Sequence, residues 1–122
     1  MSKLVAVTGA SGFVGAHLVA ALARRGLRLR LLVRRWSPLP SLAGVSADMV
    51  LGDLGDEAAL KRLVAGADAV IHAAGLIKAR HPSDFMAVNR DGTALLSALA
   101  PDATFLLLSS LAAREPQLSP YA

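Results

Sequence analysis

Three glycines at three-residue intervals, Gly9, Gly12 and Gly15, lie at the junction of two different sequence patterns. The apolar, β-branched segment 4–7 that precedes them is typical of a strand, and the apolar residues that follow recur at helical spacing. A glycine turn between a strand and a helix is the context in which proteins bind the phosphates of a dinucleotide. The unpaired N–H groups of the first helical turn face the anion there, and the helix dipole favours its charge.

Each glycine has its own expected role. Gly9 lets the chain turn sharply off the strand, Gly12 lets the backbone approach a pyrophosphate, and Gly15 lets the helix pack closely on the sheet. The spacing is G-x-x-G-x-x-G, which differs from the G-x-G-x-x-G of the commonest dehydrogenase fingerprint. The residues expected to contact the cofactor in this segment are Gly9, Ser11, Gly12, Phe13, Val14 and Gly15.

The uncharged stretch 4–23 also admits a second interpretation, a signal peptide or a membrane span. Against it, the stretch contains three glycines, a threonine, a serine and a histidine, and the sequence Arg24-Arg25-Gly26 that follows is typical of a helix C-terminus. The chain has no cysteine, which excludes a disulfide framework and thiol chemistry. We therefore expect a cytoplasmic protein without a membrane partner.

The net charge of +4 raises the question of a nucleic-acid partner, because six arginines fall within twelve residues. Two of them end a helix, two alternate with leucines on a short strand, and no aromatic residues interleave them to stack on bases. The three histidines are not at zinc-ligand spacing. The sequence therefore predicts neither a nucleic-acid partner nor a metal site.

Strands and helices alternate along the whole chain. Strands are expected at 3–8, 29–33, 48–51, 68–72 and 104–108, the last of them buried on both faces because its apolar run is continuous. Helices are expected at 13–25, from an N-cap at Asp56 to Gly66, and from an N-cap at Ser83 to Pro101, with a loop after Ser110. This alternation predicts one α/β domain over 1–122, a doubly wound parallel sheet (a Rossmann fold) with strand order 3-2-1-4-5.

The end of the second strand indicates which dinucleotide binds. An acidic residue there would favour NAD, whereas Arg34, with Arg35 beside it, matches the 2′-phosphate of NADP. Ser11 adds a hydroxyl, and Trp36 is expected near the adenosine end. NADP is thus favoured over NAD, the alternative being that the two arginines only begin a solvated loop.

Three further polar residues lie at the ends or on the inner faces of the expected elements. Asp53 ends an apolar strand, where its carboxylate can accept from the adenine amino group, and its rival role as a helix N-cap is better filled by Asp56. Asn89 falls among apolar helix positions, so it either braces the strand ends or takes part in catalysis. His72 is expected to be a satisfied core histidine without a chemical role.

Six short motifs in a characteristic order carry a resemblance to a known family. They are T-G-A-S-G-F-V-G at 8–15, Gly52-Asp53-Leu54, His72-Ala73-Ala74-Gly75, Val88-Asn89-x-x-Gly92-Thr93, Leu108-Ser109-Ser110 and Ser119-Pro120-Tyr121. Together they resemble the extended branch of the short-chain dehydrogenase/reductase superfamily, which comprises nucleotide-sugar epimerases, dehydratases and dihydroflavonol-reductase-like enzymes. The resemblance covers the whole chain. It implies that Asp53 and Leu54 contact the adenine and that Ala73, Ala74 and Gly75 lie beside the nicotinamide.

The same resemblance implies the catalytic groups. Tyr121 would exchange a proton with the substrate oxygen and Ser110 would orient that oxygen, with Ser109 as the alternative; both serines otherwise only mark a strand end. A lysine four residues after the tyrosine would lower the phenol pKa from about 10 toward neutrality. The chain ends one residue after Tyr121. We therefore expect the amino-terminal cofactor portion of such an enzyme, truncated after the fifth strand, inactive by itself, with Tyr121 disordered or displaced.

Two functions of different classes remain at this point. The first is an NADP-dependent oxidoreductase or sugar-nucleotide epimerase or dehydratase that acts on a small molecule in its intact form. The second is a non-catalytic nucleotide-binding module, a redox sensor or structural subunit. In either case the exposed edge of the fifth strand predicts self-association of the chain.

Overall fold

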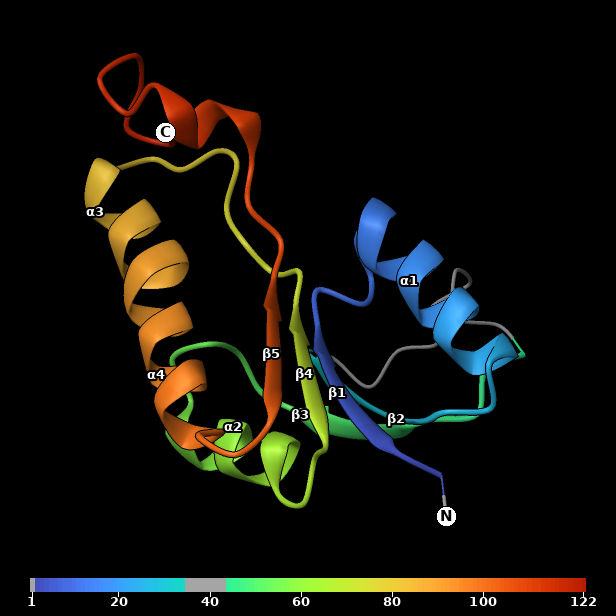
Figure 1. Ribbon diagram of the computed structural model, residues 1–122. Coiled ribbons are helices and arrows are strands. Elements are labelled where there is room, and N and C mark those ends of the chain that lie inside the picture. Colours follow the sequence, from blue (N-terminus) through green and yellow to red (C-terminus); the bar gives the residue numbers. More distant parts are fainter. Residues whose placement is uncertain (1, 35–43) are drawn as a thin grey trace.

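Five parallel strands form one sheet in the computed structural model, which describes residues 2–34 and 44–122 (Figure 1). The order is β3-β2-β1-β4-β5, and all four pairings are parallel. The predicted fold class and strand order are thus confirmed. The strands are β1 (Leu4–Thr8), β2 (Arg28–Val33), β3 (Asp48–Leu51), β4 (Ala69–His72) and β5 (Thr104–Leu107).

Helices cover both faces of the sheet, and each face has its own core. Helix α1 (Phe13–Arg24) packs on one face, while α2 (Glu57–Val64) and α4 (Thr93–Leu99) pack on the other (Figure 1). The α1 core contains Val7 and Leu31, and the opposite core contains Leu60 and Leu96, all of them fully buried. In the part of the chain that the structure describes, none of the helices is long and apolar enough to cross a membrane.

The predicted helix boundaries are confirmed where a local cap defines them. Gly26 follows α1 with φ +75°, and its N–H donates to Ala23 O at 3.0 Å. Gly66 follows α2 with φ +70°, a conformation that glycine adopts without strain. At the other end of α2 the Asp56 carboxylate accepts from Ala59 N at 3.0 Å, as expected for the N-cap.

The helix predicted from Ser83 to Pro101 differs in two respects. Its N-cap lies two residues earlier, because Pro82 occupies the first helical position and His81 is the N-cap, with its N–H donating to Asp84 Oδ2 at 3.3 Å. It is also not uniform: α3 (Pro82–Phe85) continues into the π-helical segment η2 (Met86–Gly92) before α4 begins. The prediction of Ser83 as the cap is therefore wrong, and the π-helical turn has no signal in the apolar periodicity.

The fifth strand is not buried on both faces as its apolar run predicted. Within residues 2–34 and 44–122, strand β5 pairs only with β4, and Leu106 and Leu107 are 51% and 49% exposed. Only Phe105 packs against the α2–α4 core. A continuous apolar run shows which surfaces can be buried, but the position of the strand in the sheet decides whether they are. The loop expected after Ser110 is likewise interrupted by a short 3₁₀ helix, η3 (Leu111–Arg114).

One strand arginine has a structural role that the alternating pattern did not reveal. Arg30 Nη1 on β2 donates to three carbonyl oxygens at the end of α2, those of Arg62 and Leu63 at 3.1 Å and of Ala65 at 2.7 Å. These carbonyls have no partner within their own helix, and a positive charge is favourable at a helix C-terminus. Arg30 therefore ties α2 to the sheet.

Candidate cofactor site

The turn after β1 passes close to the segment that follows β4. Gly9 has φ +75°, and a Cβ built on it would lie 2.6 Å from both Ala73 C and Ala74 N. Because β1 and β4 are neighbours in the sheet, their carboxyl ends bring these two backbone segments together. Gly9 therefore has two reasons to lack a side chain: its left-handed backbone conformation and the lack of space for a Cβ.

The N-terminus of α1 is open. Gly12 is its N-cap in an extended conformation, no side chain caps the helix, and its first turn contains no acidic residue. A Cβ on Gly15 would collide with the Gly9 carbonyl oxygen, so Gly15 lets the helix lie close against the turn that follows β1. The free N–H groups of this first turn and the positive end of the helix dipole fit a phosphate group.

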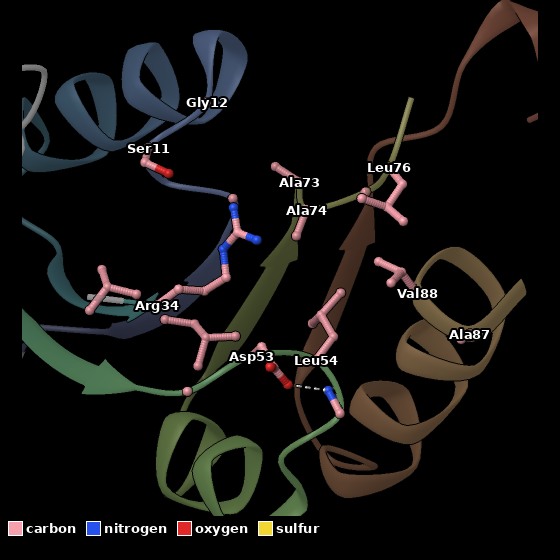
Figure 2. A pocket seen from close by; sticks show the side chains of 16 residues that line it. Ser11, Gly12, Arg34, Asp53, Leu54, Ala73, Ala74, Leu76, Ala87 and Val88 are labelled. Atoms are coloured by element: carbon pink, nitrogen blue, oxygen red, sulfur yellow. Dashed lines mark hydrogen bonds between the residues drawn. The ribbon is translucent and has the colours of Figure 1, made fainter. Parts of the chain in front are cut away.

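A pocket of about 740 Å³ lies beside this helix end, at the carboxyl ends of the first four strands (Figure 2). It brings together most of the predicted contact residues, although they come from four separate segments of the chain. Those that line it are Gly9, Ser11, Gly12, Arg34, Asp53, Leu54, Ala73, Ala74 and Gly75. Phe13, Val14 and Gly15 were also predicted contacts, but none of them belongs to the lining, and Phe13 is 83% exposed.

Among the described residues, two charged side chains line this pocket. Arg34 follows β2 and is exposed, and Figure 2 shows its side chain extending toward the segment that carries Ser11. Asp53 follows β3, and its Oδ1 accepts from Gly55 N at 2.8 Å, which orients the carboxylate (Figure 2). Arg35 and Trp36, the other residues predicted at this end, lie outside the described residues.

Several lining residues were missed by sequence reasoning. They are Leu32, Val33, Gly52, Gly55, Leu76, Ala87 and Val88. Most of them are sequence neighbours of predicted contact residues, so their position at the ends of strands could have identified them as part of the pocket. Ala87 and Val88 belong to η2, and a Cβ on Gly92 of the same segment would lie 3.0 Å from the Cβ of Leu54. Close packing at Gly92 thus brings the π-helical segment to the wall of the pocket.

The segment after β4 is fixed from two directions. Ala73 N donates to Thr8 O and Ala74 N donates to Thr8 Oγ1, both at 3.2 Å. Asn89 Oδ1 accepts from Leu76 N at 2.8 Å, and Asn89 Nδ2 donates to Leu76 O at 2.9 Å. Of the two roles left open for Asn89, the structure shows the bracing one.

His72 is a fully buried histidine with both ring nitrogens paired, as expected. Its Nδ1 lies 2.6 Å from Thr8 Oγ1, and its Nε2 lies 2.9 Å from Thr93 Oγ1. Burial lowers the pKa of His72 below its ordinary value, because the charged ring loses solvation.

The two residues predicted to be catalytic lie elsewhere. Ser110 Oγ accepts from Ala112 N at 3.2 Å and so caps η3. The ring of Tyr121 lies 6.0 Å from the ring of Phe85 between centroids. Neither residue is among the described residues that line the pocket.

The parallel sheet of order 3-2-1-4-5, with a glycine turn and an open helix N-terminus at the strand-order switch between β1 and β4, defines a dinucleotide-binding α/β domain of the Rossmann type. Within that class the family is defined as well. Residues 5–117 match the model of the NAD dependent epimerase/dehydratase family, and the chain belongs to this family.

Individual relatives include reductases. The ceramide reductase of Caulobacter vibrioides is 54% identical over 121 residues, which are 98% of this chain and 38% of that protein. A 4-hydroxy-2-methyl-3-oxo-4-farnesyl-3,4-dihydroquinoline-1-oxide ketoreductase of Stigmatella aurantiaca is 39% identical over 98 residues, 80% of this chain and 29% of that protein. A short-chain dehydrogenase/reductase superfamily structure from Agrobacterium tumefaciens with bound NAD has a TM-score of 0.73 and 33% identity, covering 88% of this chain and 33% of that one. The chain thus spans less than two fifths of the length of these relatives.

Proposed function

We propose that residues 1–122 form the NADP-binding domain of a reductase of this family and bind NADP(H) in preference to NAD(H). The observation that carries the cofactor preference is the position of Arg34 in the pocket, on the side of Ser11. A guanidinium group matches the geometry of a phosphate, and a neighbouring hydroxyl adds a further donor. The Agrobacterium relative contains NAD, so the preference rests on Arg34 and not on that likeness.

In this proposal the pocket is occupied along its length. The pyrophosphate lies at the N-terminus of α1, because free N–H groups converge there. The adenosine lies between Arg34 and Asp53, whose free carboxylate oxygen accepts from the adenine amino group. The nicotinamide lies against the segment 73–76, which carries small side chains at Ala73 and Ala74 and hydrogen bonds at both ends.

We propose further that the substrate of the whole protein is a ketone on a molecule with a long hydrocarbon chain. The support is the 54% identity with a ceramide reductase and the 39% identity with a ketoreductase whose name contains a 3-oxo and a farnesyl group. Bound NADPH supplies the hydride for the carbonyl carbon. Tyr121 would donate a proton to the carbonyl oxygen, and Ser110 would hydrogen-bond to the same oxygen after exchanging its bond to Ala112 N.

Calorimetric titration of the chain with NADP⁺ and NAD⁺ tests the cofactor assignment. The wild-type chain is expected to bind NADP⁺ more tightly, and Arg34→Ala is expected to remove most of the difference. Because Arg34 is exposed, the loss belongs at the lower end of the range for a charge-assisted bond, about 1.5 kcal/mol or roughly tenfold in affinity.

Arg28→Ala is the matched control, since Arg28 is an exposed arginine on the same strand and does not line the pocket. This variant should bind both dinucleotides like the wild type. Equal affinities for NADP⁺ and NAD⁺ in the wild-type chain would overturn the proposed preference.

A second candidate, a nucleotide-binding module without turnover, is favoured by the positions of Ser110 and Tyr121 away from the described pocket lining. The coding sequence beyond codon 122 distinguishes the two. A lysine four residues after Tyr121, followed by a substrate lobe, supports the reductase. A stop codon supports the module.

A further inference from the structure

A network of hydrogen bonds, fully buried at Thr8 and His72 and half-buried elsewhere, joins the two sides of the segment 73–76. His72 lies at its centre, with Nδ1 on Thr8 Oγ1 at 2.6 Å and Nε2 on Thr93 Oγ1 at 2.9 Å. From Thr93 the network continues to Asn89, whose carbonyl oxygen accepts from Thr93 Oγ1 at 2.7 Å and whose side-chain oxygen accepts from Leu76 N. From Thr8 it continues directly to Ala74 N.

The hydrogen bonds of Thr93 determine which imidazole nitrogen of His72 carries the proton. A hydroxyl has one proton to donate, and Thr93 gives its proton to Asn89 O. Toward His72 the Thr93 oxygen can therefore only accept. The ring nitrogen that faces it, Nε2, must carry a proton.

The Thr8 side leads independently to the same assignment. Thr8 Oγ1 accepts from Ala74 N and lies in contact with His72 Nδ1, and the residue is fully buried. If Nδ1 carried a proton, the Thr8 hydroxyl hydrogen would lack an acceptor among these partners, at a cost that a buried site does not offset. The Thr8 hydroxyl therefore donates to an unprotonated Nδ1. Every hydrogen bond in the network then has one defined donor and one defined acceptor, and His72 is neutral with its proton on Nε2.

We infer that His72 is a positioning residue for the dinucleotide: its Nε2–H tautomer links β1 to α4 and thereby sets the place of the segment 73–76 in the cofactor pocket. This inference rests on the proposed cofactor site. The two strands that flank the switch point supply Thr8 and His72, and the pocket segment begins immediately after His72. Loss of this hydrogen-bond network leaves the adenosine half of the pocket, at Arg34 and Asp53, intact.

The first experiment reads the tautomer without any cofactor. Long-range ¹H–¹⁵N correlation spectra of the ¹⁵N-histidine-labelled chain at neutral pH should show one ring with a protonated Nε2 and an unprotonated Nδ1. That signal is assigned to His72 by its absence in His72→Gln, since the other two histidines, His17 and His81, are exposed. A cationic ring, or a proton on Nδ1, overturns the inference and leaves the proposed function untouched.

The second experiment separates positioning from stability. Thr93→Val removes the acceptor for Nε2–H and the donor to Asn89 at almost constant volume, while Thr93→Ser keeps the hydroxyl. We expect Thr93→Val to weaken NADPH binding about tenfold, a factor that corresponds to ~1.4 kcal/mol, with adenosine 2′,5′-bisphosphate bound within about twofold of the wild type. Thr93→Ser should restore most of the NADPH affinity.

Thr104→Val is the control, because Thr104 is an exposed threonine on β5 that does not line the pocket. It should bind both ligands like the wild type. Equal losses of affinity for NADPH and for the bisphosphate in Thr93→Val would mean that the hydrogen-bond network has only a structural role, and this result would overturn the inference. If the wild-type chain binds neither ligand, the proposed function fails as well.

Discussion

The only asparagine of the chain, Asn89, places both ends of its side-chain amide on a single residue, Leu76. Its Oδ1 accepts from Leu76 N at 2.8 Å, and its Nδ2 donates to Leu76 O at 2.9 Å. The Asn89 amide thus bonds both backbone groups of Leu76, as a neighbouring strand would. Leu76 lies four residues beyond the end of β4, so this contact fixes one wall of the pocket.

Replacing this amide should loosen the segment after β4. Asn89→Ala removes two hydrogen bonds, each worth about 1 kcal/mol, so the free energy of unfolding should fall by about 2 kcal/mol in urea titrations. Gln117→Ala is a suitable control, because Gln117 forms an exposed bond to Glu115 and its loss should change stability by less than about 0.5 kcal/mol. A stability of Asn89→Ala within that same margin would contradict the bracing role.

The glycines of the turn should separate folding from cofactor binding. A Cβ on Gly15 collides with the Gly9 carbonyl oxygen, whereas a Cβ on Gly12 only touches that oxygen at 3.4 Å. Gly15→Ala should therefore lower the melting temperature strongly. Gly12→Ala should fold but lose dinucleotide affinity, because its methyl group stands where the phosphate approaches the helix. Circular dichroism melting with calorimetric titration of both variants measures the two effects, and full NADP⁺ affinity in Gly12→Ala would contradict the phosphate position.

Burial of His72 predicts a pH dependence of stability with a defined sign. Because the pKa in the folded chain is below the ordinary value of 6.5, the unfolded chain binds more protons between these two pKa values. Stability should therefore fall as the pH is lowered through and below about 6.5. Urea unfolding from about pH 8 to about pH 5 should show a steeper loss for the wild type than for His72→Gln, whose side chain does not titrate. Parallel curves for the two proteins would exclude His72 as the source.

The open edge of β5 predicts self-association of the 122-residue chain. Leu106 is 51% exposed on this strand, whose second edge has no partner strand in the part of the chain that the structure describes. Sedimentation velocity should show species larger than a monomer as concentration rises, and Leu106→Lys should shift the distribution toward the monomer. Leu118→Lys, at a leucine that is 76% exposed but outside the sheet, is the control and should change little. A strictly monomeric wild type at high concentration would contradict this prediction.

The elements that sequence reasoning located well are those with a local cause. Every predicted strand lies within one residue of its observed start and end, because apolar runs and glycine punctuation act over a few residues. The ends of α1 and α2 followed from Gly26, Gly66 and Asp56 for the same reason. Parallel pairing and strand order followed from the alternation of these elements.

Features that depend on neighbours distant in the sequence were missed. Nothing in the local pattern predicts the π-helical turns at 86–92, where Gly92 packs against Leu54 and Thr93 Oγ1 donates to Asn89 O. The apolar run of β5 could not reveal that the strand lies at an edge of the sheet with exposed leucines. For the site, the predicted turn, Arg34 and Asp53 line one pocket, while Phe13 and Val14 do not.

By itself the sequence determined the sheet, its order and the glycine turn, because these follow from side-chain periodicity and from backbone conformations that only glycine adopts without strain. The tertiary structure alone decided how the pocket wall is held. Thr8 and His72 come from two strands and are fully buried, while Asn89 and Thr93 come from the helical region 86–99 and are half-buried. Their hydrogen bonds form only when the fold brings these four residues together. Burial removes water as an alternative partner, and for that reason the ring nitrogen that carries the proton of His72 is a property of the fold and not of the sequence pattern.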